Sequence, residues 1–140
     1  MNKCARGIII LNNHILLIKR IKNNHLYHVF PGGHCLENEE DKRTCIREVK
    51  EETNLDIEPV KKVKVVEESS SFETVFFLCK LDSKPDSMHK LPKLTIIGIE
   101  KDRNNKNNYY KPIWVQLKQI DNMVIYPKVV VDYISANFIK

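Results

Sequence analysis

Three glutamates, Glu48, Glu51 and Glu52, are spaced so that one face of a helix would carry all of them. The stretch from about Asp41 to Thr53 is rich in charged helix formers and contains neither Gly nor Pro, which predicts a helix. Residues three and four apart lie on one side of a helix, so the three carboxylates would gather there. Gathered carboxylate oxygens suit a hard divalent cation such as Mg²⁺, although a water-exposed acidic face is the simpler alternative.

The charge distribution around this stretch favours a cation site. The chain has 23 Lys and Arg against 18 Asp and Glu, a formal net charge of +5. Nine acidic and four basic residues lie between Glu37 and Glu58, so this window carries −5 and the rest of the chain +10. A focused acidic patch in a basic chain suggests a bound cation, surrounded by positive charge that draws in anions such as polyphosphates.

A glycine turn precedes the predicted helix. Pro31, Gly32 and Gly33 follow the apolar run from Tyr27 to Phe30. Two adjacent glycines permit a positive φ and a close approach of the backbone to a ligand. A strand, this turn and the acidic helix would place a carbonyl of Gly32 or Gly33 beside the carboxylates, as a further oxygen ligand.

Together these residues resemble the signature of the Nudix hydrolase family. That signature is Gly, five residues, Glu, seven residues, Arg-Glu, a bulky aliphatic residue, any residue, Glu-Glu, any residue, Gly and a bulky aliphatic residue. Over residues 33–55 all fixed positions but one match without a gap, and the departure is Asn54 in place of Gly. Asn tolerates the left-handed conformation better than other non-glycine residues, so we expect the helix to end normally there. The aligned positions are Gly33, Glu39, Arg47, Glu48, Val49, Glu51, Glu52, Asn54 and Leu55.

The resemblance implies a fold and an activity. The fold is an α/β/α sandwich with a mixed β-sheet, and the strand and helix pattern predicts the same class over one domain of residues 1–140. The activity is divalent-metal-dependent hydrolysis of a diphosphate bond in a nucleoside diphosphate linked to another group, such as a (d)NTP or a nucleotide sugar. The alternative is a non-catalytic nucleotide- or RNA-binding module on the Nudix fold. The expected cofactor is Mg²⁺, with Mn²⁺ as an alternative.

The resemblance also assigns roles within the signature. Glu48 and Glu52 would be the main catalytic metal ligands, with Glu51 on the same face and a Gly32 or Gly33 carbonyl completing the shell. Arg47 would orient a glutamate rather than contact the substrate. Glu39 would brace the loop through hydrogen bonds.

The base that accepts the proton of the attacking water is left open by the sequence. Many Nudix chains carry a further Glu after the signature that reaches the metal or the water. Glu100, at the end of an apolar run that predicts a strand, is the candidate here, although an ordinary strand-end charge is the alternative. Among Glu48, Glu52 and Glu100, our hypothesis is Glu48.

Substrate-binding residues are expected among basic and aromatic side chains. Arg20 ends the second apolar run, where the resemblance places a phosphate-contacting residue, and an exposed strand end is the alternative. Aromatic rings can stack on a base, although core packing is their more frequent role. We assign Tyr27, Phe30 and Trp114 to substrate binding, with Tyr109 and Tyr110 as further candidates.

The remaining elements are predicted from periodicity and turn residues. Strands are expected over residues 5–11, 15–20, 60–67, 72–80, 94–100 and 109–117, with a hairpin at Asn12-Asn13, a loop over 21–26 and a boundary at Pro59. A last helix is expected from Pro127. The predicted core-facing residues of the two helices are Cys45, Ile46 and Val49 in the first, and Val129, Val130, Tyr133, Ile134 and Phe138 in the second.

Composition bounds the environment of the protein. No apolar run is long enough for a membrane span, and four cysteines without CxxC spacing indicate free thiols in a reducing, cytoplasmic compartment. The expected partner is a small nucleotide. RNA is open, but no stripe of Arg and aromatic residues supports it, and the resemblance leaves a homodimer open. His25 and His28 would lie on opposite faces of an extended segment, which disfavours a histidine metal site.

Overall fold

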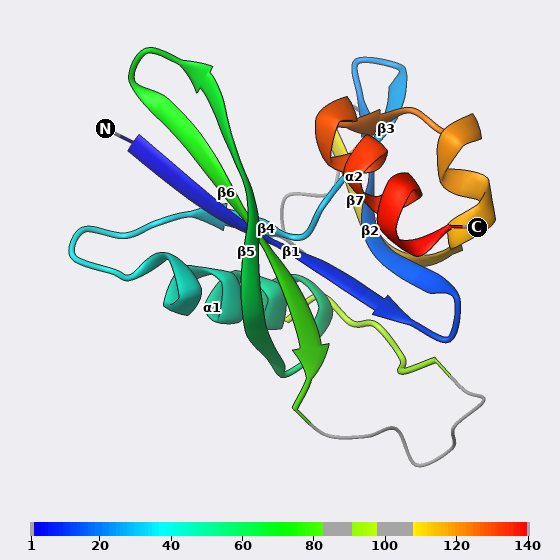
Figure 1. Cartoon of the computed structure of the whole chain (residues 1–140), viewed down its shortest axis with the longest axis horizontal. Coiled ribbons are helices and arrows are strands. Elements are labelled where there is room, and N and C mark those ends of the chain that lie inside the picture. Colours follow the sequence, from blue (N-terminus) through cyan, green and yellow to red (C-terminus); the bar gives the residue numbers. More distant parts are fainter. Residues whose placement is uncertain (1, 83–90, 98–107, 140) are drawn as a thin grey trace.

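The structure, a computed structural model, describes residues 2–82, 91–97 and 108–139 (Figure 1). The predicted helix over residues 41–53 is confirmed, and Asn54 ends it in the left-handed conformation, at φ 63° and ψ 19°. The elements are β1 (Asn2–Leu11), β2 (His14–Lys22), β3 (His25–Val29), β4 (Gly32–His34), α1 (Asp41–Thr53), β5 (Ile57–Ser69), β6 (Phe72–Leu81), β7 (Asn108–Gln116), the 3₁₀ helix η2 (Leu117–Asn122), β8 (Ile125–Tyr126) and α2 (Lys128–Phe138).

Eight of these strands form one mixed sheet. Its order is β5-β6-β1-β2-β3-β8, with β4 also paired to β1 and β7 also paired to β2. The β1–β6 and β3–β8 pairs are parallel, and the other pairs are antiparallel. The sheet therefore branches at β1 and β2, and the short β4 places the two glycines beside β1 and close to α1.

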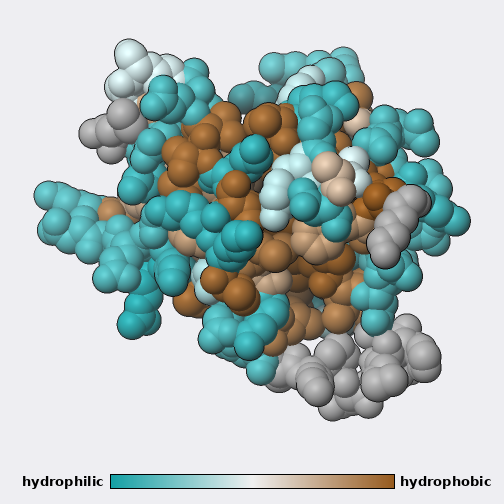
Figure 2. Space-filling view, viewed as in Figure 1, coloured by the Kyte–Doolittle hydropathy of each residue, from teal (hydrophilic) through white to brown (hydrophobic). Residues whose placement is uncertain are grey.

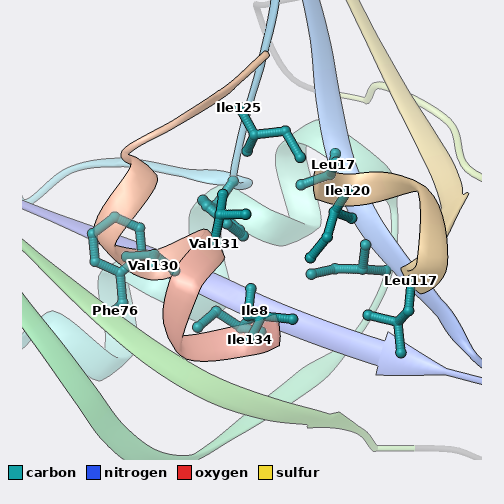
Figure 3. Packing of buried hydrophobic residues seen from close by; sticks show 11 residues of the cluster. Ile8, Leu17, Phe76, Leu117, Ile120, Ile125, Val130, Val131 and Ile134 are labelled. Atoms are coloured by element: carbon teal, nitrogen blue, oxygen red, sulfur yellow. The ribbon is translucent and has the colours of Figure 1, made fainter. Parts of the chain in front are cut away.

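Helices cover both faces of this sheet, which confirms the predicted α/β/α sandwich (Figure 1). Successive strand residues point to opposite faces, so Ile8 faces α2 while the adjacent Ile9 faces α1. The α1-side cluster contains Ala5, Ile9, Leu16, Cys45, Val49, Leu55, Ile57, Val75, Phe77 and Cys79. The α2-side cluster contains Ile8, Ile15, Leu17, Phe30, Phe76, Leu117, Ile120, Ile125, Val130, Val131 and Ile134 (Figure 3).

One face of the molecule exposes apolar as well as polar side chains. In the space-filling view, hydrophobic residues gather near the middle of the visible face and hydrophilic residues form most of its rim (Figure 2). Within the described residues no helix combines the length and apolar character that crossing a bilayer requires.

Two Asn-Asn turns shape the first three strands. Asn12 and Asn13 have φ of 49° and 62°, which confirms the predicted hairpin. Asn23 and Asn24 have φ of 51° and 65° and form a second hairpin, so the prediction of a loop over residues 21–26 is wrong. The polar side chains there lie on strands that extend beyond the packed core.

Two other predicted boundaries differ in the structure. Pro59 does not precede β5 but lies inside it, beside a register shift, which is acceptable because β5 is an edge strand. Residues 94–97 form no strand. Instead, the Thr95 and Ile97 N–H groups donate to the Thr53 and Glu51 carbonyls at 3.1 and 2.8 Å, which supplies partners for the last turn of α1.

The buried faces of the helices also differ from prediction. Ile46 is 36% exposed, and Val129 and Phe138 are 45% and 37% exposed, so these three are not core residues. In α1 the buried stripe comprises Thr44, Cys45, Val49, Glu52 and Thr53. Glu52 therefore lies on the core-facing side of the helix, and not on a separate acidic face.

Candidate active site

Pairing with β1 fixes the glycine turn at the start of the site. Gly32 lies opposite Arg6, whose Nη1 donates to the Phe30 carbonyl at 2.7 Å, and the Gly7 N–H donates to the Pro31 carbonyl at 2.8 Å. Gly32 has a φ of 151°, and a Cβ there would lie 2.3 Å from the Ala5 carbonyl oxygen. Only glycine fits at this position, because both the conformation and the close approach exclude a side chain.

We predict that Gly32→Ala lowers the free energy of unfolding by about 3 kcal/mol, since the methyl group meets backbone atoms at a positive φ. Denaturant unfolding followed by circular dichroism measures this loss. Gly33→Ala is the matched control, because its Cβ would meet only the flexible Glu48 side chain. Equal losses in the two variants would contradict the prediction.

Two carboxylates of α1 meet this turn. Glu52, 7% exposed, accepts a hydrogen bond from the Gly32 N–H at 2.7 Å. The Glu48 carboxylate lies against Gly33, where an added Cβ would stand 2.5 Å from Glu48 Cδ. Gly33 has no positive φ, so glycine is required there for space and not for conformation. The structure thus brings Glu48 and Glu52 to the same pair of glycines.

Arg47 connects Glu48 to the loop before the helix. Its Nη1 donates to Glu48 Oε1 at 2.8 Å, while Nε and Nη2 donate to Glu39 Oε2 and Oε1 at 2.9 and 3.0 Å. Glu39 Oε1 also accepts from the Leu36 N–H at 3.0 Å and the Thr44 hydroxyl at 2.7 Å. These contacts are the bracing predicted for Glu39, and they hold one oxygen of Glu48 in place.

The contacts of Arg47 with Glu39 and Glu48 also change the pKa values of these groups. Hydrogen bonding by Arg47 above all, with the Leu36 and Thr44 donors, lowers the pKa of Glu39 from 4.5 to about 2. Hydrogen bonds to Glu39 and then to Glu48 raise the pKa of the Arg47 guanidinium. Glu39 and Arg47 are therefore both fully charged at neutral pH.

A pH dependence follows for Glu39. A carboxyl with a lowered folded-state pKa contributes stability above pH 4.5, and this contribution is lost as the pH falls toward 2. We expect Glu39→Gln to cost about 1 kcal/mol at pH 7, a small value because solvent screens a partly exposed pair. Denaturant unfolding from pH 7 to 2 should show the difference from wild type vanishing near pH 2. The exposed Glu58, paired to Lys80, provides the control variant Glu58→Gln, and a constant difference across this range would contradict the prediction.

Glu51 is the most exposed of the three α1 glutamates. Its side chain is 34% exposed and its carboxylate lies 3.6 Å from Arg47 Nη1. In the described part of the chain no three His, Cys, Asp or Glu side chains are grouped closely enough to hold a metal ion. The structure thus brings together two of the three predicted acidic ligands, along with the backbone of the glycine pair.

A narrow gap between Glu52 and the sheet is too small to hold a water molecule. It is lined by Ile18, Glu52, Ile96, Tyr110 and Pro112. Arg20 follows Ile18 on the same face of β2, and its guanidinium carbon lies 3.9 Å from the Tyr110 ring centroid and 5.7 Å from that of Tyr27. Arg20 and Tyr27 are therefore on the same side of the sheet as the α1 carboxylates.

Two other residues assigned to substrate binding, Phe30 and Trp114, lie on opposite sides of the sheet. Phe30 is 1% exposed and packs edge-on against Phe76 at 5.7 Å on the α2 side, so its assignment to substrate binding is wrong. Trp114 donates from Nε1 to the Pro92 carbonyl at 2.9 Å and packs against the α1-side cluster. Glu100 lies outside the described residues.

Several supporting residues were missed at the sequence level. Arg6 shapes the turn, Thr44 contacts Glu39, and Asn108 Oδ1 accepts from Arg20 Nη2 at 2.9 Å. Only Thr44 lies within the signature region. The other two act through pairing with distant strands, for which the local sequence holds no signal.

Comparisons with known proteins identify the family and the fold of the chain. The NUDIX domain family model matches residues 1–130. A structure from a study of MutT from Aliivibrio salmonicida and Vibrio cholerae is 19% identical, covers 98% of this chain and 98% of that chain, and has a TM-score of 0.67. An ADP-ribose pyrophosphatase of Streptococcus suis is 23% identical, covers 89% of this chain and 79% of that chain, and has a TM-score of 0.59. A NUDIX hydrolase from Nitrosomonas europaea is 19% identical, covers 97% of this chain and 71% of that chain, and has a TM-score of 0.68.

At these identities the solved structures establish the shared fold. Comparison with curated proteins gives no significant match. The family model, by contrast, extends over nearly the whole chain and includes the glycine turn, α1 and the sheet. The chain therefore belongs to the NUDIX domain family and is a Nudix hydrolase.

Proposed function

We propose that this Nudix hydrolase cleaves the diphosphate bond of a nucleoside diphosphate linked to another group, in a reaction that requires a divalent cation. The observation that carries the proposal is the meeting of Glu48 and Glu52 at the Gly32–Gly33 backbone. Two carboxylates gathered beside backbone carbonyls suit a divalent cation, and such a cation can in turn neutralise the negative charge of a diphosphate.

The residues present fit a hard cation. Carboxylate oxygens of Glu48 and Glu52, with a carbonyl of Gly32 or Gly33, are the donors that Mg²⁺ and Mn²⁺ prefer. Because Gly33 has no side chain, the Glu48 carboxylate can lie directly against the glycine backbone. When bound, the cation would neutralise the diphosphate and lower the pKa of a coordinated water. Glu51, on the exposed side of the same helix, would add negative charge or a further ligand.

The residues of the proposed site have distinct roles in this reaction. Arg47 fixes the direction of Glu48, and the Gly32 N–H fixes Glu52. We assign to Glu48 the acceptance of the proton from the attacking water, with Glu52 and Glu100 as alternatives. Arg20 would contact a phosphate from the neighbouring sheet face, and the +10 charge outside the acidic window would raise the local concentration of polyphosphates.

A substrate panel tests the proposal. Nucleoside triphosphates, nucleotide sugars, ADP-ribose and dinucleoside polyphosphates are incubated with Mg²⁺, Mn²⁺ or excess chelator, and the released phosphates are quantified. We expect cleavage of at least one class with either metal and none in chelator. Full activity in chelator would contradict metal dependence. Saturable binding without any turnover would instead support the non-catalytic binding module.

The location and assembly of the enzyme are part of the same proposal. The four free thiols are stable in a reducing compartment, and on that ground we place the enzyme in the cytoplasm. Light scattering of the purified chain tests whether it forms the homodimer that the resemblance leaves open.

A further inference from the structure

A short segment without regular structure, residues 91–97, lies along the last turn of α1 (Figure 1). The Thr95 and Ile97 N–H groups donate to the Thr53 and Glu51 carbonyls at 3.1 and 2.8 Å. The last four carbonyls of a helix have no partner within the helix, so donors from elsewhere fix the final turn. The 91–97 segment therefore supports the part of α1 that carries two of the three site glutamates.

The indole of Trp114 attaches the 91–97 segment to the sheet. Trp114 lies in β7 and donates from Nε1 to the Pro92 carbonyl at 2.9 Å. It pairs with Leu16 of β2, and both Trp114 and Leu94 of the segment pack against the α1-side cluster. A directed hydrogen bond and shared apolar packing thus hold the segment between β7 and α1.

The segment also closes the space beside Glu52. Ile96 lines the narrow gap between Glu52 and the sheet, which has no room for a water molecule. Glu52 is 7% exposed, and its Oε1 accepts from the Gly32 N–H at 2.7 Å. On the side of the gap, therefore, the carboxylate cannot turn away from the glycine turn into water. The other residues that line this gap are Ile18, Tyr110 and Pro112.

We propose that Trp114 is a positioning residue of the hydrolase and acts on Glu52 through the 91–97 segment. By fixing this segment, Trp114 holds Ile96 beside Glu52 and supports the last turn of α1. Residues that orient a metal ligand from outside the coordination shell typically change metal affinity or activity by about 10- to 100-fold when they are replaced. The inference rests on the proposed function, and it gives Trp114 a role other than the substrate binding assigned from the sequence.

Hydrogen exchange tests the anchoring step without metal or substrate. Trp114→Phe keeps an aromatic ring and removes the N–H that binds Pro92. We expect native-state exchange of the Thr95 and Ile97 amides to become about fivefold faster, the effect of losing one hydrogen bond. Val115→Ala is the matched control, because Val115 is the next residue of β7 but packs against the α2-side cluster. It removes packing of the sheet and should leave both exchange rates unchanged.

Mn²⁺ titration tests the effect on the site. Trp114→Phe and Ile96→Ala should each weaken Mn²⁺ binding about tenfold. Ile96→Ala opens the gap beside Glu52 and leaves the indole hydrogen bond in place, so it also tests the inference if Trp114→Phe does not fold. Ile97→Ala is its control, because this neighbouring side chain is 48% exposed. Ile97→Ala and Val115→Ala should bind Mn²⁺ like the wild type, and circular dichroism establishes that each variant is folded.

Steady-state kinetics separate positioning from substrate binding. On the best substrate of the panel, Trp114→Phe should lower kcat about tenfold and change KM by less than about twofold, because it displaces a catalytic group and removes no substrate contact. A raised KM with unchanged kcat would show that Trp114 binds the substrate, and would overturn the inference.

Two further results would overturn it. They are wild-type Mn²⁺ binding in both Trp114→Phe and Ile96→Ala, and equal weakening by Trp114→Phe and Val115→Ala, since lost stability would then be the cause. If the wild type itself binds no Mn²⁺ and cleaves nothing in the panel, the proposed function is wrong. The exchange rates then decide by themselves whether Trp114 holds the 91–97 segment.

Discussion

Replacing Glu48 by Gln is expected to lower kcat about a thousandfold at saturating Mg²⁺, an effect of the size seen when one electrostatic group of an active site is removed. Gln has nearly the same shape, so the helix and the turn should keep their packing. The amide has no charge to hold a cation and cannot accept the proton of the attacking water. Arg47 keeps its two hydrogen bonds to Glu39, so its side chain should stay in place in the variant.

Steady-state kinetics on the best substrate of the panel measures this effect. Glu58→Gln removes a glutamate that lies outside the site, and it should stay within about twofold of wild type, as surface substitutions usually do. If Glu48→Gln retained near wild-type turnover, Glu48 would have no part in the chemistry, and Glu52 or Glu100 would have to be the base.

Gly33→Ala is expected to lower kcat about a hundredfold while the protein stays folded, because displacing a catalytic group by about 1 Å has that order of effect. The added Cβ would lie 2.5 Å from Glu48 Cδ, and 2.7 and 2.9 Å from its two oxygens. The Glu48 carboxylate can move aside, so Gly33→Ala should displace Glu48 without unfolding the protein. At Gly32 the nearest atoms are backbone, so Gly32→Ala should lower the free energy of unfolding.

Alanine at the two adjacent glycines should therefore affect different properties: kcat at Gly33 and stability at Gly32. Thermal unfolding and kcat are measured for both alanine variants under one set of conditions. Gly33→Ala should shift Tm by no more than about 4 °C, which corresponds to roughly 1 kcal/mol in a chain of this length. A fully active Gly33→Ala enzyme would show that the place of Glu48 beside the turn does not matter for catalysis.

The site could be predicted from the sequence to the extent that it is local. The turn, α1 and the Asn54 cap lie within one continuous stretch, where spacing alone determines which residues are neighbours. Helix periodicity placed Glu48, Glu51 and Glu52 near one another. It did not determine the rotation of α1 against the sheet, which buries Glu52 and leaves Glu51 outside.

Residues that depend on strand pairing were harder to predict. Tyr27 lies in the middle of β3 and Phe30 directly follows this strand, yet Tyr27 contacts Arg20 and Phe30 lies in the α2-side core. Because helices pack on both faces of this sheet, an aromatic residue near β3 can belong to either side, and hydrophobicity alone does not distinguish them. The approach of Tyr110 and Asn108 to Arg20 depends on the long-range pairing of β7 with β2, which no local pattern reveals.

Cation binding by the α1 carboxylates is tested most directly by titrating the protein with Mn²⁺ and following free Mn²⁺ by electron paramagnetic resonance. We predict saturable binding by the wild type, at least tenfold weaker binding by Glu48→Gln and by Glu52→Gln, and unchanged binding by Glu58→Gln. Equal Mn²⁺ binding by the wild type and both site variants, or no saturable binding by the wild type, would contradict the account.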